Sequence, residues 1–409
     1  MTVTILSLFD GMACGYIAFK ELGIPIGKYD AFEIDKYAVQ TSSHNFPDIV
    51  HKGNVFNADF SQYKNIDWLI GGSPCTYWSI AQKSSTRETE ASGIGWELFS
   101  QYVRALKQAS PKYFIYENNK SMSKQIKESI SATFGFDPIC INSALVSAQN
   151  RQRLYWVGIR QTDGTYKKAG IEQPEDRKIF LKDILDGMTD REKGRCIIST
   201  TVRECFYKSQ GNMALEPVAP VCAAERGRYT TGGEIKQNYE VRIDGKTNTL
   251  TTVQKDNNVC EPVRVGSYPR PNGELSTSQA FRIYGVSGKS TTLTANGGGS
   301  GAKTGLYAIP VEYKGEEPTK AISDTTGQTY PVYKVTNGEI IIKDRKYPIK
   351  LKDGYYIIRK LTVNECKRLQ TVPEWYEFPV SDTQAYKMLG NGWTVEVIKH
   401  LIKTVQKEA

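Results

Sequence analysis

The sequence of 409 residues is poor in histidine and contains no long apolar run. Its three histidines, His44, His51 and His400, lack the paired Cys/His spacing of a structural zinc site. It also lacks any stretch near the roughly 20 apolar residues that cross a bilayer. The first residues carry no basic segment or cleavage site typical of export. We therefore expect a cytoplasmic protein without a metal or a membrane anchor.

The eight cysteines are scattered, and none belongs to a C-x-x-C pair. In so large a chain without an export signal, this spacing favours reduced thiols over a disulfide framework. A hydrophobic fraction of 39% and a charged fraction of 24% are typical of a globular protein, and the length allows two domains. The net charge of +9 fits either ordinary solubility or a polyanionic partner, and charge alone does not decide between them.

Short β-type runs alternate with helix-length segments in residues 1–160. Strands are expected at 3–9, 29–34, 67–70, 113–117 and 154–159. This alternation predicts an α/β fold with a mostly parallel sheet and helices on both faces.

Residues 161–354 are richer in Gly, Thr, Ser, Asn and Tyr, and their Thr-rich runs precede polar turns, which predicts a β-rich unit of hairpins. Helical patterning returns near residue 355, where Thr362 and Glu365 have the spacing of a capping box. We therefore predict one domain formed by 1–160 and 355–409, with 161–354 inserted as a second.

The stretch "LFDGMACG" ends the first expected strand and opens a helix. Small residues at such a turn let a ligand approach the free N–H groups of the helix N-terminus. Glu33 ends the second strand, where an acid commonly binds ribose hydroxyls. The stretch is not G-x-G-x-x-G, so a tight turn without a ligand explains its glycines nearly as well. The added acid favours an adenosine-containing ligand.

The stretch "GGSPCTYWS" places Cys75 directly after the expected strand 67–70. Most single cysteines pack as small buried hydrophobes, but the glycine pair and Pro74 suggest a shaped turn. Glu117 ends the next expected strand in "KYFIYENN". Ligands of open α/β sheets bind outside the carboxyl ends of strands. Cys75 is therefore a candidate nucleophile, and Glu117 a candidate acid.

In "SAQNRQRLYWV", Gln149, Arg151 and Arg153 alternate along one face of an expected strand. Two arginines on one face favour an anion. A solvated basic edge strand is the plain alternative.

Together, in this order, the motifs resemble those of the C5-cytosine-specific DNA methyltransferase family, with wording closest to the subgroup of the animal de novo enzymes. Six stretches are similar to the family's AdoMet-binding motif, Pro-Cys nucleophile motif, Glu-Asn-Val motif, Gln-x-Arg-x-Arg motif, ninth motif and last motif. They are "LFDGMACG", "GGSPCTYWS", "YENN", "QNRQR", "RKLTVNECKRLQTVP" and "LGNGWTVEV". Residues 161–354 then occupy the place of the family's target-recognition domain.

The resemblance implies a Rossmann-like class I AdoMet-dependent methyltransferase fold. It implies methyl transfer from S-adenosyl-L-methionine, released as S-adenosyl-L-homocysteine, to C5 of a flipped cytosine in a specific sequence of double-stranded DNA, through a covalent bond between Cys75 and C6. Catalysis would use Cys75, Glu117, Arg151 and Arg153. The cofactor-binding residues would be Phe9, Asp10, Gly11, Gly15, Glu33, Asn54, Val55, Pro74, Asn391 and Trp393. A monomer in a bacterial cell or phage-infected host is expected, and whether a cognate restriction endonuclease exists stays open.

Several residues depart from the family pattern. Asn119 replaces the usual Val beside the catalytic acid, Asn54 replaces the Asp that contacts adenine, and Ala13 and Cys14 replace common glycines. None of these changes removes a group essential to the chemistry. Residues 76–95 are polar and are expected to form a mobile loop that closes over DNA.

Three other functions remain open at this point. A tRNA cytosine-5 methyltransferase is disfavoured by the length of segment 161–354, and an inactive DNA-binding relative by the intact Cys75 and Glu117. A small-molecule methyltransferase needs no Pro-Cys thiol. Basic residues of the insertion would be phosphate contacts or solvated charges, among them Arg226, Arg228, Lys255 and Lys303.

Overall fold

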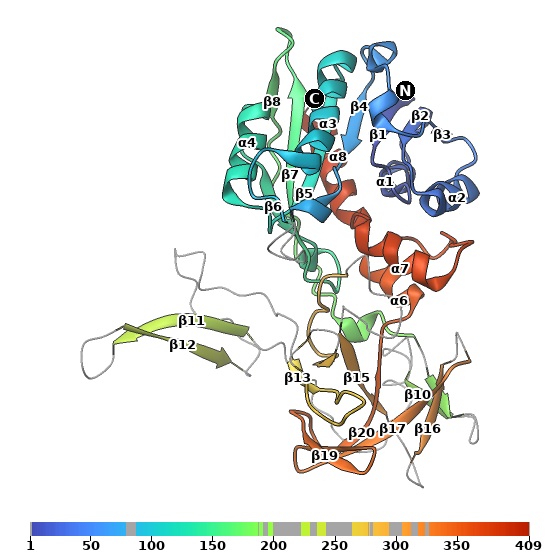
Figure 1. Cartoon of the computed structure of the whole chain (residues 1–409), viewed down its shortest axis with the longest axis vertical. Helices are drawn as coiled ribbons and strands as arrows, with labels where there is room; N and C mark the ends of the chain where they lie inside the picture. The colour runs from blue at the N-terminus through green and yellow to red at the C-terminus, as the bar shows by residue number, and fades with distance from the viewer. Residues whose placement is uncertain are drawn as a thin grey trace. The chain divides into compact units, whose positions relative to one another are not determined.

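In a computed structural model of the chain (Figure 1), two compact units are present. The first contains Met1–Val146, Arg151–Arg177 and Lys367–Ala409, and the second contains Ser147–Asn150 and Lys178–Cys366. The structure describes residues 2–78, 87–186, 188–190, 195–198, 222–229, 235–242, 264–276, 278, 281–293, 305–311, 318–323 and 327–408.

An eight-stranded sheet forms the centre of the first unit, in the order β3-β2-β1-β4-β5-β7-β6, with β8 beside β7. Strands β1 to β5 are parallel, whereas β7 runs antiparallel to β5, β6 and β8. The strands are β1 (Val3–Leu8), β2 (Ile26–Phe32), β3 (Val50–His51), β4 (Trp68–Gly71), β5 (Tyr113–Asn119), β6 (Ile139–Asn142), β7 (Gln152–Arg160) and β8 (Tyr166–Lys168). All five strands expected from the sequence are therefore present, as β1, β2, β4, β5 and β7.

Helices cover both faces of this sheet because successive side chains of each strand point to opposite sides. On β4, Leu69 faces a core that includes residues of α3 (Gly93–Ala109) and α4 (Lys124–Phe134). Trp68 and Ile70 face the other way, toward α1 (Cys14–Glu21). The remaining helices of the unit are α2 (Lys36–Asn45), α7 (Asp382–Asn391) and α8 (Val395–Glu408), with short 3-10 turns η1 (Val55–Asn57), η2 (Phe60–Tyr63), η3 (Cys75–Tyr77) and η4 (Ser143–Leu145).

The last helix belongs to the same unit as the first strand (Figure 1). The apolar face of α8 that the sequence predicts is buried, and α8 packs against α1. Its buried residues are Val395, Val397, Ile398, Leu401, Ile402 and Val405. The two ends of the sequence therefore complete one core.

The second unit is dominated by strands, in agreement with its Thr- and Gly-rich composition. One sheet has the order β10-β9-β16-β17-β20-β15-β14-β13, β18 and β19 extend it beside β17, and β11 and β12 form a separate pair. The strands are β9 (Met188–Asp190), β10 (Arg195–Ile198), β11 (Cys222–Tyr229), β12 (Ile235–Arg242), β13 (Arg264–Ser267), β14 (Arg282–Gly285), β15 (Leu306–Val311), β16 (Lys320–Ser323), β17 (Thr329–Thr336), β18 (Glu339–Ile342), β19 (Arg345–Pro348) and β20 (Gly354–Arg359), and η5 spans Leu181–Asp183.

The start of α6 (Val363–Leu369) has the predicted capping box. Glu365 N donates to Thr362 Oγ1 at 3.1 Å, and Thr362 N donates to Glu365 Oε2 at 2.8 Å. The buried side chain of Glu365 also pairs with Arg359 at 2.6 Å. This network fixes the end of the second unit.

The boundaries of the two units along the chain differ from 160 and 355. The first continues to Arg177 because β8 pairs with β7. The second continues to Cys366 because β20 pairs with β15 and β17. None of the helices in the described part of the chain has the length and apolar character needed to cross a membrane.

Candidate active site

The turn after β1 has a left-handed backbone conformation that residues other than glycine rarely adopt. Phe9, Gly11 and Ala13 have φ values of 58°, 58° and 60°. Glu33 braces this turn, because its Oε2 accepts from Gly11 N at 2.8 Å while its Oε1 accepts from the N–H groups of the two residues that follow it. Glu33, the acid expected to bind a ribose, is thus fixed beside the Gly-rich turn.

Asp10 lies in the same turn with one satisfied and one unsatisfied oxygen. Ser7 and Tyr29 donate to Oδ1 at 2.5 and 2.6 Å. Oδ2 is buried and has no hydrogen-bond partner among the described residues. Burial raises the pKa of Asp10 to about 6, against the lowering effect of the two hydroxyl donors. Oδ2 is therefore a ready acceptor for a cationic or N–H group of a ligand.

Other residues predicted at the cofactor contact the protein itself. A Cβ on Gly15 would lie 2.3 Å from Ile70 Cδ1, so this glycine lets α1 approach β4. Asn54 Oδ1 accepts from Phe56 N at 3.0 Å and starts η1. Val55 is buried, and its carbonyl oxygen accepts from Arg104 at 2.9 Å. These contacts shape the edge of the sheet beside the Gly-rich turn.

The two glycines after β4 make room for neighbouring strands. A Cβ on Gly71 would lie 2.6 Å from Leu8 O, and a Cβ on Gly72 would lie 2.8 Å from both Glu117 O and Glu117 Oε2. From the sequence, this glycine pair suggests a shaped turn. In the structure Gly72 gives room to the carboxylate of Glu117.

The turn that leads to Cys75 is tied to the end of β5. Ser73 Oγ shares a hydrogen bond of 2.6 Å with Tyr116 OH, and Asn118 Nδ2 donates to Ser73 O at 3.1 Å. Pro74 is exposed, and Cys75 then begins η3. The side chain of Cys75 lies outside the described part of the structure. The backbone nevertheless brings the Pro-Cys step beside the strand that ends in Glu117 and Asn118.

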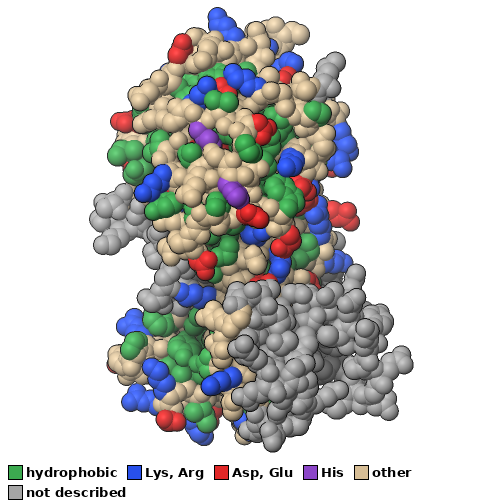
Figure 2. Space-filling model, turned by 90° about the vertical axis from the view of Figure 1, so that its right-hand side faces the viewer, with side chains coloured by type: hydrophobic (Ala, Val, Ile, Leu, Met, Phe, Trp, Pro, Cys, Tyr) green, Lys and Arg blue, Asp and Glu red, His purple; other side chains and the backbone are tan. Residues whose placement is uncertain are grey.

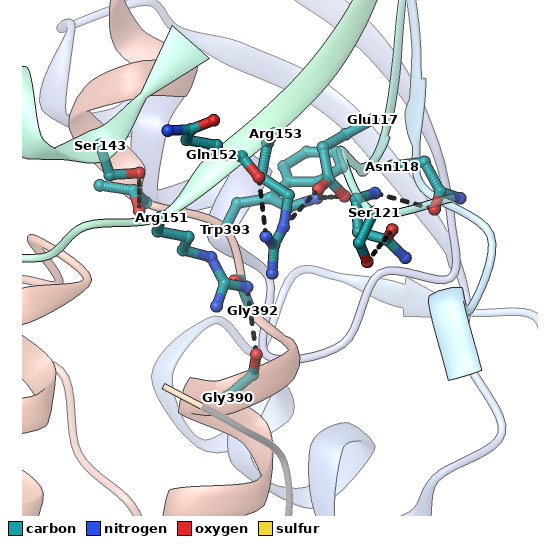
Figure 3. A network of polar contacts seen from close by, with 12 residues as sticks. Glu117, Asn118, Ser121, Ser143, Arg151, Gln152, Arg153, Gly390, Gly392 and Trp393 are labelled. Carbon is teal, nitrogen blue, oxygen red and sulfur yellow. Dashed lines mark hydrogen bonds and ion pairs between the residues drawn. The ribbon is translucent and has the colours of Figure 1, made fainter. Parts of the chain in front are cut away.

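Glu117 lies between an arginine and a tryptophan (Figure 3). Arg153 Nε is 3.1 Å from Glu117 Oε1, and the two side chains keep only 14% and 12% of their surface exposed. Trp393 Nε1 donates to Glu117 Oε2 at 2.9 Å. Three segments far apart in sequence thus meet at one carboxylate, at the carboxyl end of β5.

Arg151 and Arg153 have different partners. Gln149 and Arg151 precede β7, which begins at Gln152, so only Arg153 of the three lies on the strand. Arg151 is 3% exposed, and its Nη2 donates to Gly390 O and Gly392 O at 3.1 and 2.8 Å. It therefore holds the turn between α7 and α8.

Nearly the whole chain matches one protein family. The family profile described as C-5 cytosine-specific DNA methylase matches residues 3–407. The chain belongs to this family. The orphan methyltransferase M.SPRI of Bacillus phage SPR is 26% identical, with 98% of this chain and 96% of that protein covered. The orphan methyltransferase M.SPBetaI of Bacillus phage SPbeta is 23% identical over the same shares. Membership indicates a DNA methyltransferase.

Solved structures resemble the fold of this methyltransferase. The Entamoeba histolytica methyltransferase EhMeth has a TM-score of 0.54 at 13% identity, covering 100% of this chain and 99% of that one. The S. pombe Dnmt2 methyltransferase has a TM-score of 0.50 at 13% identity, covering 99% of each chain. The predicted Rossmann-like methyltransferase fold with a β-rich second region is confirmed.

In this methyltransferase the segment predicted to close over DNA is partly fixed. Trp78 is fully buried, and its Nε1 donates to Glu88 Oε2 at 3.0 Å. Glu88 also accepts from Gly95 N, and α3 already begins at Gly93. Both ends of the predicted loop are therefore packed against the first unit, and residues 79–86 lie outside the described part. Trp78 is a core residue.

Asn119 and Asn391, which belong to two of the recognised motifs, have different surroundings. Asn119 is buried, its Oδ1 accepts from Ser121 Oγ at 2.9 Å, and its Nδ2 has no partner among the described residues. Asn391 is exposed at the end of α7. Neither contacts Glu117 through a described hydrogen bond.

Cys14 lies in the Gly-rich turn and begins α1. Cys14 is buried, and burial raises its pKa to about 12, so it is a poor nucleophile. Within the described ranges, no three His, Cys, Asp or Glu side chains are grouped so that they could hold a metal ion. Arg226 and Arg228 lie on β11, and their side chains are outside the described part of the structure. Lys255 and Lys303 are outside the described residues.

Proposed function

We propose that this chain transfers a methyl group from S-adenosyl-L-methionine to C5 of a flipped cytosine in duplex DNA. Family membership supplies the class of reaction. The observation that carries the assignment of residues is the carboxylate of Glu117, paired with Arg153 and lying against Gly72, three residues before Cys75. An acid beside a Pro-Cys turn at the carboxyl edge of the sheet suits covalent chemistry on a base.

The Gly-rich turn fits the proposed cofactor. Asp10 Oδ2 is a buried acceptor without a partner among the described residues, which suits the cationic amino group of a methionine moiety. Glu33 stands at the turn, and a carboxylate oxygen that accepts one N–H keeps capacity for a ribose hydroxyl. When bound, S-adenosyl-L-methionine would supply a methyl group on a positively charged sulfur, and the electron pair of the broken sulfur–methyl bond would stay on that sulfur in S-adenosyl-L-homocysteine.

The residues of the site then have separate roles in the reaction with cytosine. The Cys75 thiolate forms a bond to C6, and the electron pair of the C5–C6 double bond makes C5 a nucleophile for the methyl carbon. Glu117 hydrogen-bonds at N3, where negative charge develops. Loss of the C5 proton to water restores the double bond and expels Cys75. Arg153 holds Glu117 in place through this sequence.

Duplex DNA is the proposed partner, and the second unit is the proposed reader of its sequence. On the face that Figure 2 shows, Lys and Arg side chains of the described residues lie scattered among acidic and apolar ones. The net charge of +9 is therefore not gathered on this face into a basic patch that would indicate a DNA-binding surface. Because the two phage relatives are named orphan methyltransferases, we propose action without a cognate endonuclease.

A labelling experiment tests the proposal. Wild type and Cys75→Ala are each mixed with methyl-labelled S-adenosyl-L-methionine and a mixed-sequence DNA duplex, with tRNA in a parallel reaction. We expect label in DNA with wild type alone. A duplex containing 5-fluorocytosine should trap a covalent adduct, because fluorine cannot leave C5 as a proton does.

Three results would contradict the proposal. Equal labelling by Cys75→Ala removes the role of the thiol. Label in tRNA alone assigns an RNA substrate. The absence of an adduct from an active preparation contradicts covalent addition at C6. Modified-base sequencing of DNA from cells that express the protein then identifies the methylated sequence.

A further inference from the structure

The carboxylate of Glu117 is held at both oxygens by side chains from two distant parts of the first unit (Figure 3). Arg153 approaches Oε1 at 3.1 Å, and the indole of Trp393 donates to Oε2 at 2.9 Å. We propose that Trp393 is a positioning residue that fixes the plane of this carboxylate for the cytosine. The inference rests on the proposed function and adds a role to a residue that the sequence places only at the cofactor.

The chemistry of the indole suits this task. The terminal torsion of a glutamate side chain is broad, so a carboxylate held at one oxygen can still rotate. Contacts on both oxygens, from β7 and from the turn before α8, stop that rotation. Indole nitrogen is a donor only, so Oε2 must accept at this contact. The remaining lone pairs of the carboxylate are then presented in one fixed orientation.

The backbone on both sides of Trp393 is anchored by buried side chains. Gly392 O accepts from Arg151 at 2.8 Å and from Gln370 at 3.2 Å. Thr394 Oγ1 donates to Gln370 Oε1 at 2.9 Å. Arg151, Gln370 and Thr394 are at most 3% exposed. The indole is therefore delivered to Glu117 from a rigid turn, and Arg151 acts on the carboxylate through this turn.

The test compares Trp393→Phe, which keeps an aromatic ring but removes the N–H, with Trp375→Phe. Trp375 is 43% exposed, and its indole lies 3.4 Å from Glu21 on the surface. With cofactor saturating, we expect Trp393→Phe to slow single-turnover methyl transfer to duplex DNA by about tenfold or more, because misorientation of a reacting group is costly. The affinity for S-adenosyl-L-homocysteine, measured by calorimetry, should change by less than about threefold, since the ring remains. Trp375→Phe should match wild type in both.

A second readout needs no DNA. The indole ¹H–¹⁵N resonance of Trp393 is assigned as the one missing from the Trp393→Phe spectrum. In Glu117→Ala this resonance should shift, and its proton should exchange faster with solvent, because its acceptor is gone. The Trp375 resonance should stay unchanged in Glu117→Ala.

The outcomes separate this inference from the proposed function. An unshifted Trp393 resonance in Glu117→Ala overturns the inference whether or not the protein methylates DNA. An unchanged methyl-transfer rate in Trp393→Phe also overturns it, as does a loss confined to cofactor affinity. Wild type that leaves DNA unlabelled contradicts the proposed function alone, and the resonance then decides whether Trp393 holds Glu117.

Discussion

Glu117 and Arg153 form a diagonal pair across two antiparallel strands. In the register of β5 and β7, Asn119 lies opposite Arg153, and Glu117 lies two residues away on the same face of β5. Diagonal neighbours lie within reach of long side chains, and the Nε–Oε1 distance is 3.1 Å. The pairing is thus fixed by strand register and does not depend on a loop.

Arg153→Lys should impair methyl transfer while leaving the fold intact. Lysine keeps the charge but loses the planar guanidinium that meets the carboxylate at Nε. We expect the single-turnover rate to fall by about tenfold to a hundredfold. The control is Arg160→Lys, on the same strand but bonded to Asn65 and the Ser110 carbonyl instead. Equal rates in the two variants would show that the Arg153 contact is dispensable.

Gly72→Ala should displace the carboxylate of Glu117. The added Cβ would lie 2.8 Å from both the carbonyl oxygen and Oε2 of Glu117, closer than real Cβ contacts allow. We expect loss of most methyl transfer, measured at saturating DNA and cofactor. Gly170→Ala is the matched control, because its nearest atom would be 3.5 Å away. A fully active Gly72→Ala would mean that Glu117 can move without cost.

Asp10→Asn should stabilise the protein in a pH-dependent way. Burial raises the pKa of Asp10 from 3.8 to about 6, so the folded state binds this proton more tightly than the unfolded chain. The free energy of unfolding therefore falls as pH rises from about 4 to about 6, by about 3 kcal/mol in total. In Asp10→Asn the free energy of unfolding does not undergo this fall, because asparagine does not ionise. Urea unfolding should show a gain above pH 6 that vanishes near pH 4, and a gain independent of pH would contradict the assignment.

The same substitution should weaken cofactor binding. Asparagine presents a neutral amide where Asp10 has a carboxylate whose Oδ2 has no partner among the described residues. Calorimetry with S-adenosyl-L-homocysteine should show a lower affinity at pH 8, despite the more stable fold. Unchanged affinity would place the cofactor's amino group elsewhere.

Glu365→Gln should destabilise the second unit. Arg359 and Glu365 are 2% and 0% exposed, and Glu365 Oε1 also accepts from the backbone N–H of Asp186. Removing one charge leaves the Arg359 guanidinium buried without its counter-ion, which costs about 3–5 kcal/mol. A clear drop in thermal stability is expected. For comparison, Glu339→Gln removes the carboxylate of an exposed pair with Lys346 and should change stability by less than about 1 kcal/mol.

Local patterns in the sequence predicted local structure well. The capping box of Thr362 and Glu365 depends on residues three apart, and both of its hydrogen bonds are present. The strands of the first unit follow from apolar runs that end in small or polar residues. Glu117 could be placed at the edge of the sheet because it ends such a run.

Contacts between distant segments could not be predicted in the same way. Arg151 looked like an anion-binding residue because it alternates with Arg153 in the sequence, but its acceptors are carbonyl oxygens about 240 residues later. Nothing near Gly72 in the chain indicates that Glu117 is its neighbour. Trp78 stands in the polar stretch 76–95 that suggested a loop, yet it is fully buried and its indole donates to Glu88 of the same stretch. Such contacts require the assembled sheet.

The packing of α8 against α1 has a consequence for synthesis of the protein. A ribosome makes α1 long before α8, with the whole second unit between them. At about 5–20 residues per second, the first helix waits on the order of tens of seconds for its partner. Trp393 also emerges only after the second unit, so a nascent chain carries Cys75 and Glu117 long before the turn that holds Glu117 exists. Translation itself thus delays completion of the site until the second unit has been made.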